Sequence, residues 1–146
     1  VHATTLFTNA LIERNGARTG LLTTAGFEDS LEIGRERKYE LYDIFIEMPR
    51  PLVPRPWRRG VAERLAADGS VERALDLDAA LREVAALVAE GVESLAVCLL
   101  HAYANPAHER AIAEAVAKRF PALPVSLGSE VAPEIREYPR ASTTVA

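Results

Sequence analysis

The feature that most constrains the fold is a nearly unbroken apolar run, V-E-S-L-A-V-C-L-L, over residues 92–100. A run with so little polar alternation predicts a strand covered on both faces, as in a parallel sheet. A helical stripe of apolar residues precedes it within residues 76–90, and another follows Asn105-Pro106. Residues 125–127 predict a further short strand. Because the helices give crossovers long enough for parallel pairing, we expect an α/β fold.

The first half of the chain predicts shorter elements around a long irregular segment. The expected elements are a helix, a strand, a short helix and a hairpin of two strands: residues 6–14, 18–24, 27–33, and 59–65 with 70–74. Four prolines exclude regular structure from residues 49–56, and we expect aromatic residues to pin this excursion to the body. The prediction is a single α/β domain of residues 1–146, with a parallel-containing sheet, flanking helices, an inserted β-hairpin and a Pro-rich excursion.

Composition excludes several classes of protein. The 146 residues are 49% hydrophobic and 26% charged, which is typical of a folded domain and not of a disordered chain. A net charge of -4 gives no basic surface for nucleic acid. Five arginines within residues 50–64 indicate either a solvated loop or an anion site. No run of about 18 apolar residues predicts a membrane span, and the default location is the cytoplasm.

The single cysteine and two of the histidines do not predict a catalytic or metal centre. Cys98 lies in the apolar run, where burial raises the pKa of a thiol and leaves it inert. His101 is three residues further along, so in a strand the two side chains point to opposite faces. His101 and His108 do not have a recognised ligand spacing, and we expect His108 to face solvent and no metal site to form.

Polar groups gather where the first helix is expected to begin. His2, Thr4 and Thr5 precede the apolar positions of that helix, and a helix N-terminus can bind a carboxylate, a phosphate or a developing oxyanion. The simpler interpretation is that Thr4 or Thr5 caps the helix. No G-x-G-x-x-G or G-x-x-x-x-G-K-[ST] loop occurs in the 146 residues, so a phosphate loop for a nucleotide would lie outside them.

A second polar group occupies residues 134–144. Only Ile135 is large and apolar between Pro133 and Thr144. So many hydrogen-bonding groups are costly to bury without partners, which favours a segment facing a ligand or an interface. A solvated tail explains the same composition, and the residues alone leave both interpretations open.

Several motifs together resemble the hydantoinase A and 5-oxoprolinase family. Residues 2–14 read H-A-T-T-L-F-T-N-A-L-I-E-R, where the family has H-G-T-T-x-x-T-N-A-L-x-E. Ala3 stands where the family commonly has glycine. Further blocks are similar and keep the family's order over nearly the whole chain: residues 23–29, 31–35, 41–43, 96–109, 129–138 and 140–145.

The resemblance implies part of an ATP-dependent cyclic-amide hydrolase with an actin-like ATPase fold, one that activates a ring carbonyl by phosphorylation. It implies ATP and Mg in the whole enzyme, a small cyclic-amide substrate, the remainder of the large subunit and a second, hydantoinase B-like subunit or domain. The family's glycine-rich hairpin would precede His2, so we expect these residues alone to be inactive and to hold no cofactor. Its site candidates are these: His2, Thr4, Thr5, Asn9, Arg136, Tyr138, Arg140, Ser142 and Thr143.

The alternative function comes from a different class of protein. A non-catalytic domain could bind a partner or a small acid through the arginines of residues 50–64 and the polar segment 134–144. A glycine-rich hairpin encoded just upstream would favour the enzyme.

Overall fold

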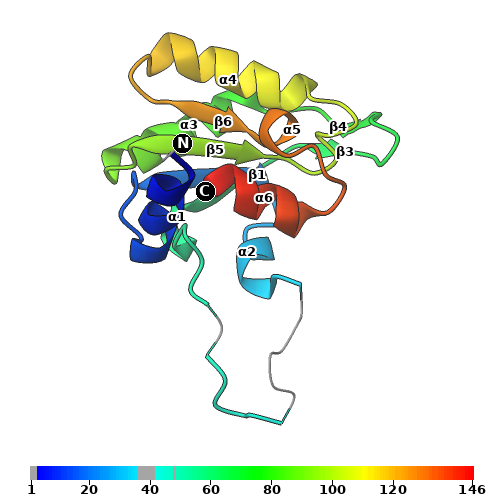
Figure 1. Cartoon of the computed structure of the whole chain (residues 1–146). Helices are drawn as coiled ribbons and strands as arrows, with labels where there is room; N and C mark the ends of the chain where they lie inside the picture. The colour runs from blue at the N-terminus through cyan, green and yellow to red at the C-terminus, as the bar shows by residue number, and fades with distance from the viewer. Residues whose placement is uncertain (1–2, 36–41, 48) are drawn as a thin grey trace.

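A computed structural model describes residues 3–35, 42–47 and 49–146 (Figure 1). Its centre is a four-stranded parallel sheet in the order β2-β1-β5-β6. The strands of this sheet are β1 (Thr19–Thr24), β2 (Arg58–Val61), β5 (Ser94–Cys98) and β6 (Val125–Leu127). A small antiparallel pair joins β3 (Arg64–Leu65) to β4 (Val71–Arg73). The predicted α/β class is confirmed.

Helices cover both faces of the sheet (Figure 1). One face carries α3 (Leu77–Ala89) and α4 (Ala107–Arg119), and the other carries α2 (Ser30–Ile33) and α6 (Glu137–Val145). Also present are α1 (Ala3–Glu13), a 3₁₀ turn η1 (Arg55–Trp57) and α5 (Gly128–Val131). Two hydrophobic clusters fill the two layers.

The apolar run at residues 92–100 forms the strand that was expected. Leu95 and Val97 belong to the cluster under α3 and α4, whereas Ala96 and Cys98 belong to the cluster under α6. Successive side chains of a strand point to opposite faces, so a strand buried on both sides must be apolar at every position. The run therefore marks a central strand of the sheet.

The hairpin prediction is wrong in part. Arg58–Val61 pairs in parallel with β1 and forms the edge of the main sheet, while only Arg64–Leu65 enters the hairpin. The alternation of apolar residues that suggested two half-buried strands is confirmed for Val61, Glu63 and Leu65, which are all buried, and is wrong for β4, whose residues Val71–Arg73 are all exposed. A turn separates β2 from β3, and in it the Glu63 amide donates to the Val61 carbonyl. No sequence pattern shows that β2 pairs with β1 and that β3 pairs with β4.

The excursion between α2 and η1 extends away from the body (Figure 1). Aromatic pinning is wrong for Tyr42 and Phe45, which are exposed, but Trp57 at the end of the excursion is half-buried and packs against both hydrophobic clusters; Tyr39 lies outside the described residues. The buried Arg58 also holds the base of the excursion. Its Nε donates to the Val53 carbonyl at 2.9 Å and its Nη1 to the Glu28 carbonyl at 3.3 Å.

The polar segment near residue 140 is a helix, which the sequence did not predict. In α6, Ala141 and Val145 pack against the sheet, and the buried Thr144 hydroxyl donates to the Arg140 carbonyl at 2.7 Å. A proline early in α6, Pro139, is compatible with a helix because first-turn amides need no intrahelical acceptor. From Glu137 onward the segment is therefore neither a solvated tail nor an open loop, whereas residues 134–136 are exposed ahead of the helix.

Candidate functional site

The sheet reverses its direction of winding between β1 and β5. From β1 the chain passes through α2 to β2 on one side, and from β5 it passes through α4 to β6 on the other. The two helices lie on opposite faces (Figure 1). In open parallel sheets, ligands bind outside the carboxyl ends of the strands at such a switch point. The residues after Thr24 and Cys98 are therefore the first candidate site.

A buried arginine from α6 fixes the backbone just after β5. The Arg140 guanidinium donates to the Leu99 carbonyl at 2.9 Å, to the Glu134 carbonyl at 2.5 Å and to the Cys98 sulfur at 3.4 Å. It also lies 5.7 Å from the centre of the Tyr103 ring. Only 1% of Arg140 is exposed, so its charge is satisfied inside the domain.

A buried carboxylate holds the same loop from the other face. Glu109, in the first turn of α4, accepts hydrogen bonds from the amides of Leu99 and Ser129, each at 2.9 Å. Burial raises the pKa of Glu109, and the amide donors and the Arg140 charge partly oppose that shift. The carboxylate thus ties β5 to the start of α5.

A second network joins the end of β1 to α4. The Thr24 hydroxyl donates to the Glu63 carboxylate and accepts from the Leu100 amide at 2.9 Å. The other Glu63 oxygen lies 2.8 Å from Nδ1 of His108. The prediction that His108 faces solvent is wrong, since its side chain is only 12% exposed and packs on this carboxylate. These contacts fix the loops on both sides of the switch point.

At the carboxyl end of the central strands, His101 has a backbone conformation that is rare for a residue other than glycine. Its φ is 55°, in the left-handed region that non-glycine residues rarely adopt. Such strain persists only where the surroundings impose it, and it is concentrated at functional positions. The half-buried imidazole meets the Tyr103 hydroxyl at 3.3 Å, so an imidazole and a phenol stand together where the loop leaves β5.

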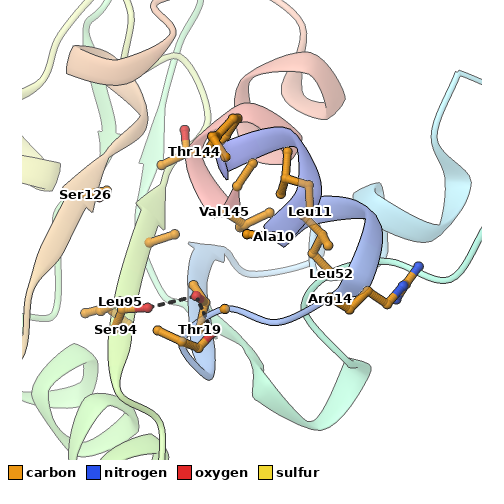
Figure 2. A pocket seen from close by; sticks show the side chains of 15 residues that line it. Ala10, Leu11, Arg14, Thr19, Leu52, Ser94, Leu95, Ser126, Thr144 and Val145 are labelled. Carbon is orange, nitrogen blue, oxygen red and sulfur yellow. Dashed lines mark hydrogen bonds between the residues drawn. The ribbon is translucent and has the colours of Figure 1, made fainter. Parts of the chain in front are cut away.

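A cavity of about 300 Å³ forms the second candidate site (Figure 2). It lies between α1, the end of α6 and the first residues of β1, β5 and β6. Phe7, Ala10 and Leu11 line it from α1, and Leu95 and Ala96 line it from the sheet. The hydroxyls of Thr19 and Ser94, 2.8 Å apart, supply polar groups. Because Arg14, Ser126 and Thr144 also line the cavity, its walls are mixed in polarity.

The structure places the predicted residues of the first helix on an open surface. Thr5 and Asn9 are exposed on α1, and His2 lies outside the described residues. Because α1 begins at Ala3, Thr4 and Thr5 occupy its first turn and neither is the cap, so that prediction is wrong.

The predicted residues of the last helix divide between surface and interior. Arg136 and Thr143 are exposed, and Tyr138 is half-buried against the cluster under α6. The Ser142 hydroxyl donates to the Pro139 carbonyl at 3.1 Å, and Arg140 is buried. The carboxyl end of α6 borders the same cavity as α1, whereas Arg136 stands at the opposite end of α6.

The ion pairs and side-chain positions bear on two further possibilities, an anion site at the arginines of residues 50–64 and a metal site. Four of the five arginines of residues 50–64 have a carboxylate within 4.0 Å, which favours a paired surface over an anion site. In the described part of the chain, no three potential metal ligands cluster. Across the same residues, no helix is long and apolar enough to cross a bilayer.

A nucleotide triphosphate does not fit these residues by themselves. The 146 residues contain no glycine-rich phosphate loop. The two buried arginines, Arg58 and Arg140, donate to carbonyls of this chain and do not point into a cavity. We therefore assign to these residues no contact with the phosphates of a nucleotide.

Some residues at the switch point were missed from the sequence. Glu109 carried a usable signal, because it shares a helical stripe with Ile112 and Val116. A charged residue on an apolar stripe is buried with partners or is functional. Glu63 had no comparable signal, since its partners come from β1 and α4, far away in the sequence.

The fold and these loops define a parallel α/β unit whose two central strands end at a switch point. Residues 1–120 match the hydantoinase/oxoprolinase N-terminal region, so the chain belongs to the hydantoinase/oxoprolinase family. This confirms the resemblance found in the motifs.

Named relatives agree with that assignment. The caprolactamase subunit alpha of Pseudomonas jessenii is 39% identical over 99% of this chain and 21% of its own length. The crystal structure of that ATP-dependent caprolactamase aligns with a TM-score of 0.86 at 40% identity, covering 94% of this chain and 20% of that chain.

Two further relatives are more distant. The 5-oxoprolinase of Saccharomyces cerevisiae is 33% identical over 98% of this chain and 13% of its own length. The acetone carboxylase beta subunit of Xanthobacter autotrophicus is 32% identical over 99% and 22%. The chain thus spans between 13% and 22% of the length of these relatives.

Proposed function

We propose that residues 1–146 form one α/β domain of an ATP-dependent enzyme that activates the ring carbonyl of a cyclic amide by phosphorylation and hydrolyses the ring. The observation that carries the proposal is the family match over residues 1–120. The similarity to a caprolactamase described as ATP-dependent, at a TM-score of 0.86, supports it. ATP supplies the phosphoryl group when bound, with Mg, on residues of the polypeptide beyond these 146.

The predicted site residues have different parts in this proposal. His2, Thr4 and Thr5 lie toward the reacting oxygen, where the start of α1 stabilises negative charge. The exposed Asn9, Arg136 and Thr143 face the substrate or an adjoining domain, with Tyr138 beside them. Arg140 and Ser142 act as positioning residues, because their polar groups are bonded within the domain.

A second subunit is part of the proposed assembly. The relatives in this family include proteins named as alpha, beta and gamma subunits. We therefore expect the whole protein to act together with a hydantoinase B-like subunit or domain. We propose that the whole protein is located in the cytoplasm.

The test uses the whole protein purified with its partner subunit. Hydantoin, 5-oxoproline and caprolactam are supplied in turn with ATP and Mg, and ADP release and ring opening are both measured. We expect one ring substrate to give equal amounts of ADP and opened product, and residues 1–146 alone to give neither. Because some relatives are carboxylases, acetone with bicarbonate is included; a carboxylated product without ring opening would overturn the cyclic-amide assignment.

Substitution of His2 tests the site within that assay. His2→Ala is expected to lower kcat by at least about tenfold, since removal of an oxyanion donor commonly costs more than that. Asn15→Ala, in the exposed turn after α1, provides the control. Unchanged turnover in His2→Ala would remove His2 from the proposed site while leaving the reaction itself in place.

A further inference from the structure

A histidine occupies a turn position that normally takes glycine. The Ala102 amide donates to the Leu99 carbonyl at 3.3 Å and closes a β-turn just after β5, with His101 as its third residue. The φ of His101 is 55°, and Leu100 before it is not among the described residues with a positive φ. A β-turn with a positive φ only at its third residue is of type II, which favours glycine or asparagine at that position. The backbone at His101 is therefore strained.

No helix end explains this conformation. Arg14 is the other described residue, glycines apart, that has a positive φ. It follows α1, where its amide donates to the Leu11 carbonyl at 3.3 Å and the Asn15 amide donates to the Ala10 carbonyl at 3.0 Å. That pair of hydrogen bonds is the Schellman ending of a helix, in which a left-handed residue is normal. His101 follows a strand instead, and strain of this kind is concentrated at positions where a side chain has a function.

The half-buried imidazole of His101 has a partner on one ring nitrogen only. Nδ1 lies 3.3 Å from the Tyr103 hydroxyl, and the two rings meet edge to face with their centres 5.8 Å apart. The Arg140 guanidinium lies over the Tyr103 ring, and a cation there draws electron density from the phenol, which makes its O–H a stronger donor. Tyr103 therefore donates to Nδ1, and the neutral imidazole carries its proton on Nε2. In the described part of the chain, Nε2 has no partner.

We propose that Nε2 of His101 donates a hydrogen bond to an oxygen of the carbonyl substrate, and that Tyr103 positions the imidazole for this contact. The turn lies at the carboxyl end of β5 beside the switch point, where open parallel sheets bind their ligands. Glu109 and Arg140 fix the backbone of Leu99, the first residue of the turn, so the donor stands on a rigid base. The inference rests on the proposed function for the presence of a carbonyl substrate, and it does not depend on which carbonyl compound reacts.

The test compares three replacements of His101 in the whole protein with its partner subunit. Glycine and asparagine suit the left-handed turn, but asparagine carries its amide only as far as Nδ1, whereas glutamine reaches the place of Nε2. Turnover is measured with hydantoin, 5-oxoproline, caprolactam or acetone with bicarbonate, whichever gives product. The value of kcat/KM should fall at least about fivefold in His101→Gly and His101→Asn and at most about twofold in His101→Gln, because only glutamine keeps the hydrogen bond.

Melting temperatures should follow a different order from activity. His101→Gly and His101→Asn relieve the strained backbone and should melt no lower than the native protein, whereas His101→Gln should melt below both. If kcat/KM and melting temperature fall together in all three variants, the imidazole is structural and the proposal is wrong. Full activity of His101→Gly would also overturn it while leaving the proposed reaction in place. A carboxylated product from acetone would overturn the proposed ring hydrolysis, and the ranking of the variants would still decide the role of His101.

A double-mutant cycle tests the positioning role of Tyr103. Tyr103→Phe removes the hydroxyl and keeps the ring beside Arg140. It should lower kcat/KM about threefold when His101 is present and have no effect in His101→Gly, because the hydroxyl acts only through the imidazole. Tyr42→Phe removes a hydroxyl from the exposed excursion and is the matched control, with unchanged kcat/KM. Equal losses from Tyr103→Phe in the two backgrounds would overturn the positioning role.

Discussion

At the scale of single residues, the arginine that precedes α6 and the arginine within it have opposite environments. Arg136 is exposed at the start of α6, whereas Arg140, one turn later, is buried and donates to three backbone carbonyls and one sulfur. Composition cannot distinguish them, because both are surrounded by the same polar sequence. Only the packing of α6 on β5 makes Arg140 interior, and that contact joins residues about 40 positions apart.

Arg140→Ala is expected to destabilise the protein. It leaves buried carbonyls such as that of Leu99 without a donor, and each unsatisfied group costs about 1–3 kcal/mol. Urea denaturation followed by circular dichroism should show a loss of at least about 2 kcal/mol. Arg136→Ala is the matched control and should stay within about 0.5 kcal/mol. Equal effects of the two substitutions would contradict the buried role of Arg140.

Cys98 provides a pH-dependent prediction. Burial raises the pKa of its thiol to about 11 from 9.0, with Arg140 opposing the shift. At pH 8 about one molecule in a thousand carries the thiolate, so iodoacetamide should label native protein far more slowly than unfolded protein. Rapid labelling of native protein at pH 8 would show that the thiol is not buried.

The same shift affects stability at high pH. Because the folded pKa exceeds the unfolded one, the contribution of Cys98 is complete below about pH 9 and is lost as the pH rises toward 11. The difference in unfolding midpoint between the native protein and Cys98→Ala should therefore shrink across that interval. A difference that stays constant from pH 8 to pH 11 would argue against the raised pKa.

At the scale of elements, the sequence predicts those whose pattern is local. The strand at Ser94–Cys98 and the helix at Leu77–Ala89 follow from an apolar run and an apolar stripe, and Asp76 caps that helix through a bond from the Ala79 amide at 2.9 Å. The partner of β2 and the helix α6 were not predictable in this way. Both depend on packing between distant segments, which overrides local propensity.

The junction of α5 with β5 is a close approach that glycine permits. A Cβ at Gly128 would lie 2.9 Å from the Cys98 sulfur and 3.3 Å from Cγ of Arg140. Gly128→Ala is therefore expected to cost about 1–3 kcal/mol through overpacking. Gly16→Ala is the control, because nothing lies within 4 Å of its added Cβ. Thermal unfolding should separate the two, and a Gly128→Ala melting temperature equal to that of Gly16→Ala would show that α5 can shift.

At the scale of the whole molecule, the described residues expose more large apolar groups than a finished surface does. Leu6 and Ile12 on α1, with Tyr42, Ile44 and Phe45 on the excursion, are all more than two-thirds exposed. Large exposed apolar patches mark interaction sites or cause aggregation, and Tyr42, Ile44 and Phe45 lie within four residues of one another on the excursion. The sequence predicted a domain within a larger enzyme through its family motifs, but only the structure shows which surfaces are left open.

Residues 1–146 produced alone are therefore expected to self-associate as their concentration rises. Sedimentation velocity should show oligomers whose fraction falls at least about threefold in Leu6→Ser/Ile12→Ser, because the two most exposed large apolar side chains in the described part of α1 are then polar. Val71→Ser/Val131→Ser is the matched control, since both valines are about half exposed but lie on other elements. If residues 1–146 stay monomeric at all concentrations, or if the two double variants have equal effects, α1 does not mediate self-association.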